Sequence, residues 1–189
     1  MDTITIKAQQ DTACFQIHNS IKALTNKYQE GFNILLDGQI ESTSGKAAIQ
    51  YLNSNEEKGV DIGLQAFLRP KGISVHLSPI TPTLLYRTFY ANKNNFIFIG
   101  DKGSIQADLE LYDENRSGLS FHSTPDSVKQ QNLNLTLSKI NISELRRIIP
   151  YMPDIAGHIN AKINYLQENA DTQVSANVSI DQFAYNKQI

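Results

Sequence analysis

The chain has 189 residues, a formal net charge of −2 and a charged fraction of 19%. This near-neutral balance gives no electrostatic basis for binding nucleic acid or an anionic membrane surface. The single cysteine, Cys14, excludes an internal disulfide and a cysteine-rich metal site, and we interpret it as a small buried hydrophobe. No stretch approaches the roughly 18 consecutive apolar residues of a membrane-spanning helix. Both ends read as interrupted strands, so we expect a fragment of a longer protein.

Alternation of apolar and polar residues with a period of two dominates the sequence. The clearest alternating runs are residues 60–68, 73–77, 104–111, 132–137, 158–165 and 173–180. Alternation of this kind is typical of antiparallel strands with one dry and one hydrated face. We therefore expect an all-β fold, an antiparallel meander of roughly ten to a dozen strands with short connections.

Dipeptides that end in glycine separate these runs, and glycine supplies the positive φ that tight hairpins require. The predicted turns are Asp37-Gly38, Lys58-Gly59, Lys71-Gly72, Lys102-Gly103 and Ser117-Gly118. Residues 100–104 ("GDKGS") lack the spacing of a phosphate-binding loop and lead into a strand, so they too predict a hairpin turn.

The dry face of such a meander must be covered. A second sheet covers it in a β-sandwich, and the sheet covers itself in a closed barrel. The third arrangement is a sheet bent into a groove, whose dry face is covered by an apolar ligand. The alternation alone favours the sandwich or the barrel over the groove.

Short helices are expected at the edge of the sheet. Ser143 is a suitable N-cap, with Glu144 in the first turn and Pro150 as the stop. The apolar residues of this predicted edge helix are Leu145, Ile148 and Ile149. A second short helix could begin at Pro82, and residues 19–30 are a further candidate.

Residues 77–85 ("LSPITPTLL") and 137–145 ("LSKINISEL") share a pattern, which reflects either chance or a repeated module. No linker divides the chain, so residues 1–189 are expected to form one β-rich module. Its candidate repeat units run from about 60 to 130 and from 131 to 189.

Residues that could carry catalysis are scattered. The four histidines, at positions 18, 76, 122 and 158, show no HExxH motif, and we interpret them as ordinary strand histidines. The adjacent carboxylates Glu56-Glu57 and Asp113-Glu114 would point to opposite strand faces, which suits no acid/base pair. We therefore expect no enzymatic activity, no metal and no cofactor.

In residues 133–186, an alternating strand runs into a short amphipathic helix that ends at Pro150. A strand with Gly157-His158-Ile159 and another at Val174–Ile180 follow. This order resembles the TamB / AsmA-like family of large bacterial envelope proteins. Residues 73–123, with Asn95-Phe96-Ile97, resemble the preceding module of that family, although Phe89 stands where the family often has Trp.

The resemblance covers about residues 60–189. It implies a sheet curled into a U-shaped, taco-like groove, in a full-length protein that is anchored in the inner membrane and spans the periplasm. It implies phospholipid transfer between inner and outer membranes or, in an older proposal, assistance to outer-membrane protein assembly with an outer-membrane β-barrel partner. The alternative is a β-sandwich adhesion module that binds protein or glycan at the cell surface.

A lipid tail needs a continuous, non-directional apolar surface, which strands supply through every second residue. The residues predicted to line a groove for phospholipid acyl chains are Ile105, Ala107, Leu109, Leu111, Leu133, Leu135, Leu137, Ile159, Ala161, Ile163, Val174, Ala176, Val178 and Ile180. Packing as a protein core is the alternative for each of them. The edge helix would shape or plug one side of the groove, and exposed edge strands are expected to let the isolated fragment self-associate.

Overall fold

The computed structural model describes residues 2–11, 13–23, 31–124, 130–145, 149, 152–168 and 171–185. The chain divides into two compact units, Met1–Thr88 (unit 1) and Phe89–Ile189 (unit 2). About 75% of the residues lie in strands, which pair antiparallel, so the predicted all-β class is confirmed.

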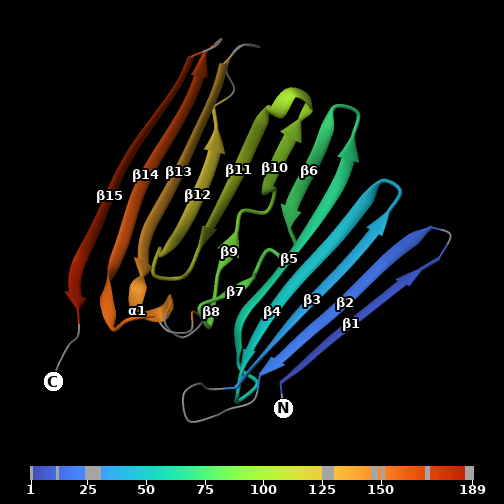
Figure 1. Ribbon diagram of the computed structural model, residues 1–189. Coiled ribbons are helices and arrows are strands. Elements are labelled where there is room, and N and C mark those ends of the chain that lie inside the picture. The colour runs from blue at the N-terminus through green and yellow to red at the C-terminus, as the bar shows by residue number, and fades with distance from the viewer. Residues whose placement is uncertain are drawn as a thin grey trace. The chain divides into compact units, whose positions relative to one another are not determined.

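Unit 1 is a meander in which each long strand pairs with the next one in the sequence (Figure 1). Its long strands are β1 (Thr3–Gln10), β2 (Cys14–Ala23), β3 (Phe32–Glu41), β4 (Ser44–Asn53), β5 (Lys58–Arg69) and β6 (Gly72–Leu77). Two short strands follow, β7 (Thr83–Leu84), which pairs with β5, and β8 (Arg87–Thr88), which pairs with β7.

The strand register of unit 1 sorts its side chains by polarity. The two central rows of one face are Ile6, Asn19, Leu36, Ile49 and Ile62, and then Ala8, Ile17, Gly38, Ala47, Leu64 and Leu77. The adjacent rows of the other face hold Lys7, His18, Asp37, Ala48 and Gly63, and then Gln9, Gln16, Gln39, Lys46, Gln65 and His76. We call these the apolar and the polar face of unit 1.

Unit 2 is a second antiparallel meander. Its elements are β9 (Tyr90–Ala91), β10 (Phe96–Gly100), η1 (Asp101–Gly103), β11 (Ile105–Tyr112), β12 (Gly118–Ser123), β13 (Gln130–Asn141), α1 (Ile142–Leu145), β14 (Ile155–Glu168) and β15 (Asp171–Tyr185). Most of the buried apolar side chains among the described residues belong to this unit, at Phe89, Ala107, Leu111, Leu133, Ile142 and Ala161, whereas Pro82 is fully buried in unit 1.

Three of the predicted turns are confirmed and two are wrong. The chain reverses at Lys71-Gly72, at Lys102-Gly103 and just before Gly118. Asp37-Gly38 instead lies inside β3, because β2 and β4 flank that strand and the alternation continues through Gly38 onto the apolar face. Lys58-Gly59 begins β5 for the same reason, since β4 pairs with it from Lys58 onward.

The helix predictions need correction. Pro82 starts no helix, because Thr83 and Leu84 pair with β5 and the next two residues turn with positive φ, 53° at Leu85 and 62° at Tyr86. Of residues 19–30, those up to 23 belong to strand β2, and 24–30 lie outside the described residues.

Helix α1 is present but begins earlier than predicted. The Ser143 amide donates to Asn141 Oδ1 at 2.9 Å. Asn141, and not the predicted Ser143, therefore supplies the side-chain acceptor for an amide of the first helical turn. Segment 77–85, which shares a sequence pattern with 137–145, contains strand β7 at the positions where the later segment contains helix α1. The repeat units stay a prediction. Among the described residues, no helix has the length and apolar character needed to cross a bilayer.

Candidate functional site

The apolar face of unit 1 is open to solvent. Ile40 is 61% exposed and Leu64 is 40% exposed, although both are large aliphatic residues in the interior of the alternating pattern. The described strands of unit 1 make one sheet, and none of them forms a second layer over this face. An apolar surface of this extent is unfavourable in water and marks an interaction site.

The apolar face is hollowed near its centre. A cavity of about 320 Å³ lies there. Its apolar lining residues are Ile17, Leu36, Ala47, Ile49, Ile62 and Leu64. Gly38 and Ala47 have little or no side chain, so the space above them is not filled. A Cβ added at Gly38 would meet no atom within 4 Å. Small residues in the middle of large ones therefore create the hollow.

One polar side chain interrupts the hollow. Asn19 lies between Ile6 of β1 and Leu36 of β3 in a row that is otherwise aliphatic. Its Oδ1 atom is buried and has no hydrogen-bond partner. An unsatisfied buried acceptor destabilises a fold, so Asn19 has no evident structural benefit at this position.

In unit 2 the structure places the residues predicted as groove lining on one sheet face. Leu109, Leu135, Ile163 and Ala176 share a row through Phe121, and Leu111, Leu137, Ala161 and Val178 share the next row through Leu119. A third row joins Leu133 and Val174 through Tyr165, and Ala107 adjoins it because the Ala107 amide donates to Ser123 Oγ at 2.9 Å. Ile159 lies opposite Ile180, and Ile105 lies opposite Ile99. Adjacency on one face is thus established for the set, while its contact with lipid stays a prediction.

These residues differ in burial. Ala107, Leu111, Leu133 and Ala161 are buried, whereas Val178 on strand β15 is 61% exposed and Val174 and Ile180 are exposed too. A cavity of about 370 Å³ opens on this face and is lined by Ile105, Phe121, Leu133, Leu135, Ile163 and Tyr165. The face therefore combines packed positions with an apolar hollow.

The edge helix is held in place by Ile142, which was not among the residues predicted from the sequence. Ile142 is only 3% exposed, and α1 packs beside β14. Leu145 is half-buried and Ile149 is exposed, with the Ile149 amide donating to the Leu145 carbonyl oxygen at 2.8 Å. Ile148 lies outside the described residues. Ile142 was missed because the helix was expected to begin after it.

The apolar face of unit 1 was not predicted from the sequence, since the predicted lining began at Ile105. The signal was present in "TITIKA", "FQIHNSI" and "AAIQY", which alternate in the same way as the later strands.

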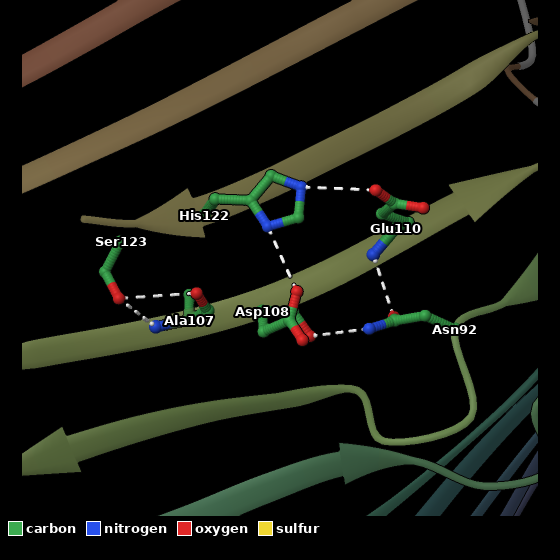
Figure 2. A network of polar contacts seen from close by, with 6 residues as sticks. All are labelled: Asn92, Ala107, Asp108, Glu110, His122 and Ser123. Atoms are coloured by element: carbon green, nitrogen blue, oxygen red, sulfur yellow. Dashed lines mark hydrogen bonds and ion pairs between the residues drawn. The ribbon is translucent and has the colours of Figure 1, made fainter. Parts of the chain in front are cut away.

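The opposite faces of the two units are polar. In unit 2, His122 on β12 contacts two carboxylates of β11, with Nδ1 at 3.1 Å from Asp108 Oδ1 and Nε2 at 3.6 Å from Glu110 Oε1 (Figure 2). Asn92 fastens the preceding segment to β11, because it donates to the Asp108 carbonyl oxygen and accepts from the Glu110 amide. No cluster of three or more His, Cys, Asp or Glu side chains suited to a metal ion occurs in the described part of the chain.

The polar face of unit 1 carries the larger hollow, of about 580 Å³, lined mostly by side chains such as Lys7, Gln16, Gln39, Lys46 and Gln65. Hydrated amides and ammonium groups need no partner in the protein, so this hollow requires no ligand to explain it. The exposed aliphatic side chains on the other face do require an explanation. We therefore take the apolar faces as the candidate site.

Comparison with known proteins does not assign this site. No family model matches the chain, and no curated protein and no solved structure matches it.

Proposed function

We propose that this chain is a non-enzymatic module that binds acyl chains on the open apolar faces of its two units. The observation that carries this proposal is the solvent exposure of large aliphatic side chains, Leu64 among them, along a whole sheet face. Each methylene group moved from water onto such a surface contributes about 0.8 kcal/mol. An acyl chain is therefore a natural occupant.

The dimensions of unit 1 suit a lipid tail. The row from Ala8 to Leu77 crosses six strands, which at about 4.8 Å per strand spacing gives a track of about 24 Å. Dispersion and hydrophobic contact have no directional requirement, so the track binds a tail without recognising its chemistry in detail. The headgroup would lie beyond the track, in water.

We extend the proposal to the wider setting that the family resemblance implies. In that setting, the chain is part of a TamB- or AsmA-like protein in the cell envelope that is anchored in the inner membrane. Its grooves would carry phospholipid acyl chains across the periplasm toward the outer membrane. Support comes from the strand and helix order of residues 73–186 and from the antiparallel meander. The adhesion alternative has less support, because within each unit the described strands form one sheet and not two packed ones.

Lipid extraction and mass spectrometry of protein purified without detergent test the proposal. We expect phospholipid to accompany the native chain and to be lost in Leu64→Asp and Val178→Asp, which put a charge on the apolar faces. The matched controls are Gln65→Asp and Ser179→Asp, which change the neighbouring residues on the polar faces. Far-UV circular dichroism verifies folding. Absence of lipid from folded native protein, or equal lipid in folded apolar-face variants and controls, would contradict the proposal.

A further inference from the structure

Strand β15 presents an unpaired edge within the described part of unit 2. It pairs with β14, and no described strand pairs with its other side. Every side chain from Asp171 to Phe183 is exposed. A free edge offers a row of backbone N–H and C=O groups, which is a template for another strand.

The edge of β15 lacks the features that usually prevent pairing. Proteins protect edge strands with Lys, Pro, short length or bulges. Strand β15 has 15 residues, and positions 171–181 contain no Lys, Arg or Pro. The one irregularity lies near Gln182, where the register with β14 shifts and φ is 53°. By contrast, the edge strand β1 of unit 1 has eight residues and carries Lys7.

We propose that β15 pairs in antiparallel fashion with β15 of a second copy of this chain, about a two-fold axis at Asn177. In this register Val174 lies opposite Ile180, and Ala176 lies opposite Val178. All four are on the apolar face of the strand, so apolar side chains meet one another across the interface.

The charges of β15 agree with this register. Within the paired segment, the Asp181 carboxylate lies opposite the uncharged Gln173. Directly opposed like charges would destabilise a strand pair.

Other registers fit less well. A shift by one residue would place each apolar side chain opposite a polar one. Centring the pair on Ala176 places Asp171 of each copy opposite Asp181 of the other. Centring it on Val178 places Val174 opposite Gln182. The register about Asn177 avoids all three conflicts.

The two-fold arrangement also limits assembly to a dimer. An isologous contact closes on itself, whereas pairing of β15 with another edge of the next copy would repeat without closure. The paired segment, residues 173–181, is about 30 Å long at about 3.4 Å per residue. Because pairing uses the edge, it does not depend on what occupies the apolar faces.

The experiment uses the full chain and sedimentation at several protein concentrations. The native chain is expected to form dimers. Asn177→Lys and Asn177→Asp each place like charges at the axis and should raise the dissociation constant about fivefold. An equimolar mixture of the two variants should restore the native dissociation constant, because the opposite charges then face each other.

Ser175→Lys is the control, since its opposite residue is Ser179 and no repulsion arises; its dissociation constant should stay near the native one. Native chain that stays monomeric at high concentration overturns the proposal. So does a dimer that Asn177→Lys leaves unchanged, or a mixture of the two Asn177 variants that pairs no better than either alone.

Discussion

Asn19 lies directly opposite Leu36 in the pairing of β2 with β3, on a face that is otherwise aliphatic at this level of the sheet. The Asn19 Oδ1 atom is buried without a hydrogen-bond partner. Asn19 is therefore a polar side chain within an otherwise apolar row.

Replacing this side chain should stabilise unit 1. We expect Asn19→Val to raise the free energy of unfolding by about 1–3 kcal/mol, because the substitution removes an unsatisfied buried acceptor and adds a β-branched residue to a strand. Urea denaturation measures the change. Asn19→Asp, of similar shape, should destabilise the fold, and a Val variant less stable than the native chain would contradict this interpretation of the row.

Gly63 on β5 and Gly38 on β3 both lie in strand interiors of unit 1 but differ in their surroundings. A Cβ at Gly63 would stand 2.2 Å from the Ser78 carbonyl oxygen, whereas one at Gly38 would meet nothing within 4 Å. Gly63→Ala should therefore lower the free energy of unfolding by about 2 kcal/mol or more. Gly38→Ala should be neutral or stabilising by up to about 1 kcal/mol, since alanine has less backbone entropy to lose. Equal effects in thermal denaturation would show that the Ser78 backbone moves aside.

The side chain of Asn92 acts as a substitute for a strand partner of β11. It donates to the Asp108 carbonyl oxygen at 3.2 Å and accepts from the Glu110 amide at 2.9 Å. Asn92→Ala should lower the free energy of unfolding by about 1–3 kcal/mol, because two backbone groups lose their partner. Hydrogen exchange at the Glu110 amide should accelerate. Asn115→Ala, in an exposed turn, is the control and should change neither quantity; an unchanged Glu110 exchange rate in Asn92→Ala would contradict the assignment.

The strands of unit 2 could be predicted because the direction of side chains along a strand depends only on local geometry. Leu133, Leu135 and Leu137 alternate in the sequence, and β13 places Leu135 between Phe121 and Ile163 on one face. Which positions are covered depends on other parts of the chain and has no local signature. Leu133 is buried and Val174, in the same row, is exposed because β15 is an edge strand.

The wrong predictions have a common origin in long-range pairing. Asp37-Gly38 has the composition of a turn, but β2 and β4 hold it extended on both sides. Thr83 and Leu84 follow a proline that could open a helix, yet they pair with Val60 and Asp61 far away in the sequence. Local propensity is overruled where a neighbouring strand is already in place.

The most direct test of the apolar-face site uses leucine methyl NMR with a spin-labelled fatty acid. Leu36 and Leu64 lie on the apolar face of unit 1, whereas Leu35 and Leu52 lie on its polar face and serve as internal controls. We expect the bound label to broaden the methyl signals of Leu36 and Leu64 more strongly than those of Leu35 and Leu52. Broadening that is absent, or that affects the four leucines equally, would show that acyl chains do not occupy this face.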